Sequence, residues 1–250
     1  MKKFILALGL GLCAAVGASA QGTTLVSIDN ETGIQKARYP IFTFGPEAGV
    51  QLSNFRAIDN GEEFQIPVRP AIRAGIVADL ALTDVVSLQS GALFSRKAYL
   101  ADQTSVKTIS RVRYREETQS YFTVNYLEIP LTLQYKFAVG NVSGLFAGAG
   151  LYGAVAFGGD IRSRTRRYAE GTGALVSAEN ARRDVLVGRD RGDDIASTDL
   201  GLNVNAGYFI NEVTFVRAHS AIGLKNLSAR ANTINSLRNF SFGVTVGLLF

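Results

Sequence analysis

Residues 126–137 read YLEIPLTLQYKF, a run in which apolar and mostly polar residues alternate. Every odd-numbered position from Leu127 to Phe137 carries a large apolar residue. The positions between them carry Glu128, Pro130, Thr132, Gln134 and Lys136. Successive side chains of a β-strand point to opposite faces, so the stretch predicts a strand with one apolar and one largely polar face.

The same period of two recurs elsewhere in the chain, whereas the period of an amphipathic helix is hard to find. The alternating stretches are 42–53, 72–80, 86–95, 145–157, 199–210, 216–225 and 240–250. Together with 126–137 they predict eight strands. Each is close to the 9–11 residues that a tilted membrane-spanning strand needs.

The connections between these strands alternate in length. Short turns lie around 83–84, 139–141 and 211–212, whereas long polar segments cover 54–67, 97–120, 159–197 and 226–237. Transmembrane barrels combine short periplasmic turns with long external loops in this way. The even strand number places both chain termini on the periplasmic side, as export through the periplasm requires. Backbone groups in lipid must be paired within the protein, so the strands are expected to close into an antiparallel ring.

A soluble eight-stranded barrel, such as a lipocalin, shows the same alternation with its apolar face turned inward. Alternation alone does not separate the two architectures. The sorted loops and the terminal Phe250 favour the membrane, as do aromatic residues near the predicted strand ends. These aromatic residues are Phe42, Tyr99, Phe137, Phe157 and Tyr208. We therefore predict an all-β fold, an eight-stranded antiparallel transmembrane β-barrel over residues 41–250 with long extracellular loops.

The start of the chain has the features of a secretory signal peptide. Lys2 and Lys3 precede an apolar stretch over 4–17, and Ala18-Ser19-Ala20 is a small-x-small cleavage site. A lone membrane anchor is the alternative. Cleavage after residue 20 leaves 21–40 as an N-terminal periplasmic extension, either a tail or a segment folded into the barrel mouth. The mature chain then lacks cysteine, because Cys13 is the only one.

Composition argues against several classes of protein. Loss of Lys2 and Lys3 lowers the formal net charge from +5 to +3, which is no footprint for nucleic-acid binding. One cysteine and one histidine do not make a multi-cysteine or His-rich metal site. His219 has Ser220 beside it, but neighbouring residues of a strand face opposite ways, so no nucleophile–base pair is expected. We predict no cofactor, no enzymatic activity and no nucleic-acid partner.

The polar face of the predicted strands carries ionisable side chains that would line the lumen. An eight-stranded barrel is just wide enough for side chains to fill it, and buried charges persist when they are paired. We therefore predict an internal salt-bridge network that closes the lumen, with a gated narrow pore as the alternative. Its members are Glu47, Arg73, Asp79, Glu128, Lys136, Arg217 and His219.

Arginine is concentrated in the predicted external segments. Arg111, Arg113 and Arg115 alternate along one of them. Guanidinium groups bind phosphate bidentately, so outer-membrane lipid and lipopolysaccharide phosphates are predicted contacts of these three residues. The alternative is that they belong to solvated loops, or to strands extended above the membrane with internal ion pairs.

Tyr126-Leu127-Glu128-Ile129-Pro130-Leu131, with the alternating residues after it, resembles the signature strand of the PorT-like outer-membrane β-barrel family. The resemblance implies a Gram-negative outer membrane and a porin-like barrel. It also implies that Phe250 is part of the assembly signal read by the barrel assembly machinery. Three roles stay open: a non-enzymatic structural or interaction barrel with a protein partner at its loops, a small transport channel, or a component of an outer-membrane secretion apparatus.

Overall fold

The computed structural model describes the chain in ten segments. They are residues 26–28, 35–37, 41–59, 62–64, 68–109, 112–139, 142–188, 190, 192–228 and 236–250. The predicted signal peptide (1–20) and Arg111 lie outside the described residues.

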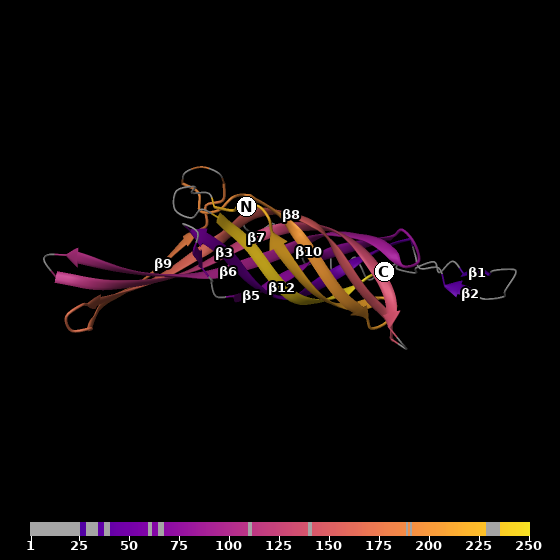
Figure 1. Cartoon of the computed structure of the whole chain (residues 1–250), viewed down its shortest axis with the longest axis horizontal. Coiled ribbons are helices and arrows are strands. Elements are labelled where there is room, and N and C mark those ends of the chain that lie inside the picture. Colours follow the sequence, from indigo (N-terminus) through magenta and orange to yellow (C-terminus); the bar gives the residue numbers. More distant parts are fainter. Residues whose placement is uncertain are drawn as a thin grey trace, which may run out of the picture.

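Eight strands form a closed antiparallel ring, which confirms the predicted barrel (Figure 1). Each strand pairs with its neighbours along the chain, β8 pairs with β10, and β12 closes the ring onto β3. The eight are β3 (Phe42–Asp59), β5 (Arg69–Ala81), β6 (Val86–Ile109), β7 (Val112–Val139), β8 (Val142–Ala169), β10 (Thr198–Phe209), β11 (Thr214–Gly223) and β12 (Ser236–Leu248).

Four further strands lie outside this ring. β9 (Leu175–Asp184) pairs with β8, and β4 (Glu62–Phe64) pairs with β3. Within the predicted N-terminal extension, β1 (Val26–Ile28) and β2 (Gln35–Ala37) form a separate two-stranded sheet.

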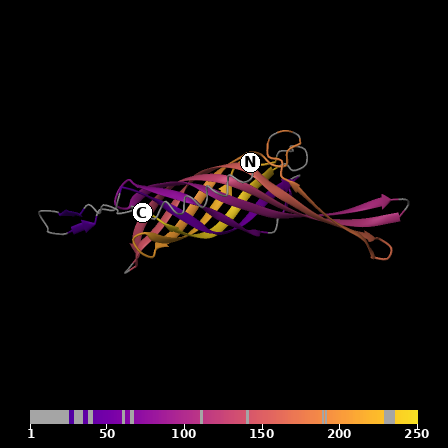
Figure 2. The same cartoon turned by 180° about the vertical axis from the view of Figure 1, so that it is seen from behind.

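Three strands are much longer than the alternating stretches predicted. β6 has 24 residues and β7 and β8 have 28 each. Their outer parts (98–109, 112–123 and 160–169) join β9 in a four-stranded extension sheet, which projects well beyond the barrel (Figures 1 and 2). The predicted loops 97–120 and 159–197 are therefore largely strands. Away from the barrel, both faces of the extension sheet are largely polar, so its sequence lacks the alternation of apolar and polar residues by which the other strands were predicted.

The barrel has two unlike ends. The end with the short connections 82–85 and 210–213 is called the turn end here, and the opposite end, which carries the extension sheet, is called the extension end. Among the described residues, no helix is long and apolar enough to cross a membrane.

The barrel wall is apolar outside and polar inside. Ile129, Leu131 and Leu133 of β7 are 51–53% exposed, whereas Glu128 and Thr132 between them are at most 2% exposed. A soluble barrel would place these two sets the other way round. The observed sidedness gives the strands a lipid-facing apolar surface, so they are transmembrane strands.

Glycines inside the wall make room for aromatic rings on the neighbouring strand. Tyr152 of β8 lies directly opposite Gly201 of β10, and a Cβ on Gly201 would overlap the ring. The same pairing joins Phe146 to Gly207 and Phe215 to Gly247. Large rings and glycines thus share the narrow interior, a packing device typical of curved sheets.

Candidate functional site

The interior of the barrel begins, at the turn end, with an apolar plug. Phe146 and Phe215 meet edge to face with ring centroids 6.1 Å apart, and both side chains are at most 1% exposed. We call this group the turn-end cluster, which consists of Val77, Leu93, Phe146, Phe215 and Leu249. The guanidinium of Arg217 lies over the Phe215 ring at 4.7 Å, so the charged layer rests directly on this cluster.

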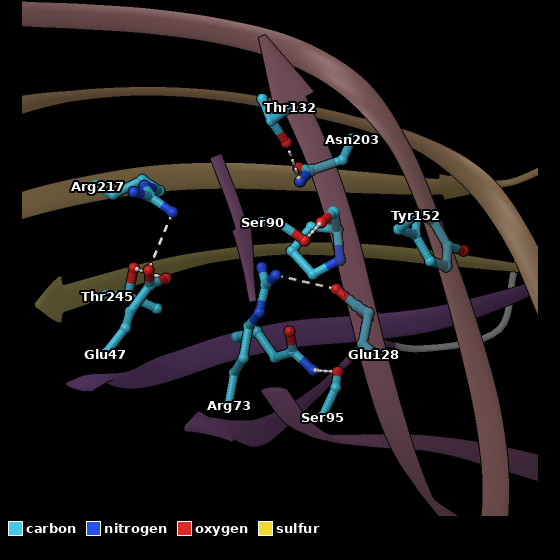
Figure 3. Close-up of polar contacts among 12 residues, drawn as sticks. Glu47, Arg73, Ser90, Ser95, Glu128, Thr132, Tyr152, Asn203, Arg217 and Thr245 are labelled. Atoms are coloured by element: carbon cyan, nitrogen blue, oxygen red, sulfur yellow. Dashed lines mark hydrogen bonds and ion pairs between the residues drawn. The ribbon is translucent and has the colours of Figure 1, made fainter. Parts of the chain in front are cut away.

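Glu47 is the first anchor of the charged layer. It accepts a hydrogen bond of 2.9 Å from Arg217 and one of 2.8 Å from the Thr245 hydroxyl (Figure 3). The three residues come from β3, β11 and β12, which are consecutive in the ring. A carboxylate with two donors and a paired guanidinium meets the condition under which buried charges are tolerated.

Glu128 is the second anchor. Its carboxylate lies 3.0 Å from the Arg73 guanidinium and 3.4 Å from the Lys97 Nζ. All three side chains are at most 3% exposed. Figure 3 shows Arg73 and Glu128 pointing toward each other across the lumen.

Asp199 extends this group toward β10. It lies 3.8 Å from Lys97 and accepts hydrogen bonds from Tyr152 and Asn239 at 2.8 and 3.0 Å. The Lys97 ammonium also lies over the rings of Tyr126 and Tyr152, at 5.1 and 5.0 Å. One buried lysine is therefore held by two carboxylates and two aromatic faces, a combination that offsets the cost of burying its charge.

The remaining predicted lumen residues also face the interior. Lys136 is directly opposite Phe146, so its pair with Asp79 lies beside the turn-end cluster and not in the charged layer. Asp79 pairs with Lys136 at 3.1 Å and accepts a hydrogen bond of 2.8 Å from Ser87. His219 is 2% exposed, and neither ring nitrogen has a hydrogen-bond partner within the described part of the chain. All seven predicted lumen residues thus point inward, and six of them form three separate groups.

Sequence reasoning missed Lys97, Asp199 and Tyr152 as members of the layer. Lys97 stood at the start of a predicted loop, and Tyr152 stood within a run of glycines. Their parity was the usable signal, because Lys97 has the same odd parity as the buried Ser87 and Ser95 of β6. Which carboxylate each cation would meet depends on strands that are not neighbours, and periodicity carries no such information.

A second apolar cluster closes the extension end. We call it the mouth cluster, and Phe55, Tyr126, Tyr152 and Leu227 are at most 1% exposed in it. Val185, Ile195 and Ala196, which lie between β9 and β10, contribute to it, and Val187 packs against it. Its other buried members are Val124, Ala154, Ala156, Ile161, Ala221 and Leu237.

Tyr99 is one of the aromatic residues near the predicted strand ends that favoured the membrane, but it does not face the lipid. Its ring stacks on Phe122 at 4.5 Å and contacts Phe55 at 4.6 Å, against the mouth cluster. The residue has the inward parity of Lys97, whereas Phe42 and Phe157 are 57% and 60% exposed on the lipid side.

The basic residues predicted to contact lipid phosphate lie on the extension sheet. Arg113 pairs with Glu170 at 2.9 Å, and Arg115 pairs with Glu117 at 3.2 Å. Both are near the tip, 12 or more residues beyond Leu127, which is about 40 Å along a strand. Their contact with phosphate stays a prediction, as does that of Arg111, and the ion pairs match the extended-strand alternative.

The chain's last residue is built into the ring. Phe250 and Phe44 exchange two backbone hydrogen bonds of 3.0 and 3.2 Å, and the Leu249 amide donates to the Val213 carbonyl at 2.8 Å. Among the described residues, no group of three or more histidine, cysteine, aspartate or glutamate side chains could hold a metal ion.

A closed ring with an apolar outer wall and a charged, filled interior defines the class of integral β-barrel membrane proteins. The sequence matches the family described as outer membrane protein beta-barrel domain over residues 35–229, well over half of the chain. The chain belongs to this family, which places it among outer-membrane β-barrels. The narrower PorT-like relationship goes beyond what this match establishes.

Comparison with solved structures finds small outer-membrane barrels. Neisserial surface protein A is 13% identical, with a TM-score of 0.38, and the alignment covers 83% of this chain and 97% of that chain. OprG from Pseudomonas aeruginosa is 11% identical with a TM-score of 0.37, and the alignment covers 83% of this chain and 95% of that chain. Ail of Yersinia pestis is 9% identical with a TM-score of 0.32, and the alignment covers 83% of this chain and 98% of that chain. No curated protein matches the sequence.

Proposed function

We propose that this protein is a closed, non-enzymatic outer-membrane barrel that anchors a rigid β-sheet outside the cell. Its barrel would serve as the anchor, and its extension sheet would serve as the interaction surface. The observation that carries the proposal is the filling of the lumen by side chains from end to end.

Three stacked layers support the closed state. Phe215 at the turn end, Glu128 in the charged layer and Leu227 in the mouth cluster are each at most 2% exposed. A water-filled channel would leave lumen side chains hydrated, as in the larger barrels with 16 or more strands. A small transport channel is therefore the less favoured function.

The extension sheet supports an interaction role. Barrels of this class place short turns in the periplasm and long segments outside, so the extension end faces the exterior. The sheet carries ion pairs on both faces, with Lys107–Glu116 at 2.9 Å on one and Arg115–Glu117 at 3.2 Å on the other. These pairs stiffen a surface that could contact lipid or a protein partner. A role in a secretion apparatus stays a prediction from the PorT-like resemblance.

Conductance in planar lipid bilayers tests the proposal. The natural protein is expected to give no steady single-channel steps. The matched variant replaces Phe215 and Leu227 by Ser, which removes one large side chain from each plug. Steady steps from the natural protein, equal to those of this variant, would overturn the closed-barrel proposal in favour of a channel.

A further inference from the structure

A group of arginines gathers around one carboxylate on the outer side of the barrel, just above the lipid-facing wall. Asp160 of β8 lies 2.7 Å from Arg162, 3.5 Å from Arg96 and 3.9 Å from Arg182. The carboxylate side chain is 9% exposed, whereas the three arginines are 60%, 40% and 66% exposed. We call these four residues the Asp160 cluster.

A β-bulge sets the direction of this cluster. The register of β7 and β8 shifts between Asn125 and Tyr126, where β8 carries one extra residue beside Gly158. Gly158 has a φ of +147°, which favours glycine. Because of the extra residue, Phe157 and Asp160 face the same outer side although they are three positions apart.

The height of the cluster matches that of lipid headgroups. Phe157 is 60% exposed on the lipid side, and its ring lies 6.1 Å from that of Phe94. Three residues cover about 10 Å along a strand, and a tilt of about 40° reduces this to roughly 7–8 Å of height above Phe157. The headgroup region adds roughly 5–7 Å to each side of the hydrocarbon core, so the cluster lies where outer-leaflet phosphates lie.

The charges around the cluster leave a positive excess. The Arg69 guanidinium lies over the Tyr121 ring at 5.4 Å, and Tyr121 is directly opposite Arg162, so Arg69 adds a fourth cation. Asp184, directly opposite Asp160, adds a second anion. Four cations face two anions, and the exposed guanidinium groups have donors beyond those that Asp160 accepts.

We propose that the Asp160 cluster binds the phosphate of a phosphorylated glycolipid in the outer leaflet. Asp160 positions the three guanidinium groups, whose remaining N–H donors bind the phosphate bidentately. This inference rests on the proposed function, because it takes the extension end to be the outer end. It differs from the predicted contacts at Arg113 and Arg115, which lie about 40 Å along the strand from the wall.

The sugars of such a glycolipid would extend along the outward face of the extension sheet. Arg164 and Arg166 follow Arg162 on this face of β8, and both line an open pocket of about 190 Å³. Glutamine, threonine and carboxylate side chains complete the pocket, which gives it donors and acceptors suited to sugar hydroxyls. The remaining lining residues are Asp102, Gln103, Thr104, Glu117, Thr118 and Gln119.

Native mass spectrometry of the full protein in detergent, titrated with lipid A that carries both phosphates, tests the proposal. The probe is compared with lipid A stripped of phosphate. We expect the natural protein to retain the phosphorylated form at least about tenfold more tightly, and the triple variant Arg96→Gln, Arg162→Gln, Arg182→Gln to lose that preference.

The matched control replaces Lys107, Arg113 and Arg115 by Gln, which removes the same charge from the extension sheet nearer the tip, away from the Asp160 cluster and from the pocket. It is expected to keep the preference. A second variant carries lysine at the three cluster positions, which keeps the charge but removes the bidentate guanidinium groups. We expect this variant to bind the phosphorylated lipid with intermediate strength. Because its charge is unchanged, it separates the effect of guanidinium geometry from that of lost charge.

Three outcomes would overturn the inference. The natural protein could show no preference for the phosphorylated lipid, or the control variant could lose that preference as fully as the cluster variant. The third is that inorganic pyrophosphate displaces bound phosphorylated lipid A as effectively as added lipid A does. The last outcome would indicate a site for free polyanions. Conductance is measured separately, so a conducting barrel that still prefers the phosphorylated lipid would overturn the proposed function and leave this inference standing.

Discussion

Arg217 donates to Glu47 across 170 residues of chain, with an Nη1–Oε2 distance of 2.9 Å. The two residues sit on β11 and β3, and β12 lies between these strands in the ring. Thr245 of β12 donates to the other carboxylate oxygen at 2.8 Å. One carboxylate therefore joins three strands at the seam where the last strand meets the first.

Removal of that carboxylate should be costly. Glu47→Ala leaves Arg217 buried beside the Phe215 ring without its counter-charge, and we expect a loss of about 3–5 kcal/mol in unfolding free energy. Urea-induced unfolding in lipid vesicles measures it. The double change Glu47→Leu with Arg217→Met should cost clearly less, since it removes both charges. Equal losses in the two variants would contradict the pairing.

Lys97 is the centre of the other charge group. Lys97→Met keeps the volume of the side chain but leaves Glu128 and Asp199 short of a cation, so a loss of about 3–5 kcal/mol is expected. The matched change Lys107→Met, on the extension sheet where the side chain is 54% exposed, should cost less than about 1 kcal/mol. The unfolding free energies of both variants are measured under the same conditions. A smaller loss for Lys97→Met than for Lys107→Met would contradict the buried charge group around Lys97.

Alternation predicted the interior well because side-chain direction in a strand follows parity alone. Glu47, Arg73 and Glu128 could be placed in the lumen before any contact was known. Their pairing could not, since Arg73 meets Glu128 from β5 and β7, which are separated by β6. Which cation crosses to which carboxylate depends on barrel tilt and stagger, and these are properties of the whole ring.

The extension sheet escaped prediction for a different reason. Thr118 and Thr165 face each other on one side of it at 3.1 Å, and Glu117 and Arg166 face each other on the other side. With water on both faces, neither side is required to be apolar, so a strand there reads like a loop. These residues form strands because they continue the pairing register of β6, β7 and β8 from the barrel wall.

Gly201 and Gly153 form a matched pair for testing the interior packing. A side chain on Gly201 would overlap the Tyr152 ring, which donates to Asp199, whereas a Cβ on Gly153 meets nothing within 4 Å. Gly201→Val is expected to cost about 1–3 kcal/mol through overpacking. Gly153→Val should stay within about 0.5 kcal/mol of the natural protein.

The readout for the glycine pair is the temperature at which the folded form disappears on detergent gels run without boiling. A clear drop for Gly201→Val alone supports the ring-over-glycine arrangement. If Gly153→Val lowers the temperature as much, the two faces of the wall have been assigned wrongly.

Glu116 gives the extension sheet a predictable response to acid. A hydrogen bond from Lys107 lowers the pKa of this carboxyl below its ordinary value of 4.5, and Arg167 contributes to the same effect. Because the folded pKa is the lower one, the stabilisation is present above pH 4.5 and is lost as the pH falls through the folded pKa. The outer parts of β6 and β7 should therefore loosen below about pH 4.5.

Amide hydrogen exchange, corrected for the intrinsic effect of pH, measures this loosening in residues 105–109 and 114–118. Residues of β11 in the membrane wall are the internal reference. Glu116→Gln should remove part of the pH response, because the amide carries no charge to lose. A response that is unchanged in this variant would point to other carboxylates.

Phe250 allows folding and assembly to be separated. Its backbone exchanges two hydrogen bonds with Phe44. Phe250→Ala keeps both bonds, so stability after refolding in detergent should change by less than about 1 kcal/mol. Deletion of Phe250 removes both bonds and should weaken the seam in the same assay.

In cells, an aromatic assembly signal predicts that Phe250→Ala lowers the folded fraction in the outer membrane several-fold, whereas Phe250→Tyr restores it. Equal folded fractions for Phe250→Ala and the natural protein would leave the residue with a structural role only, through its backbone.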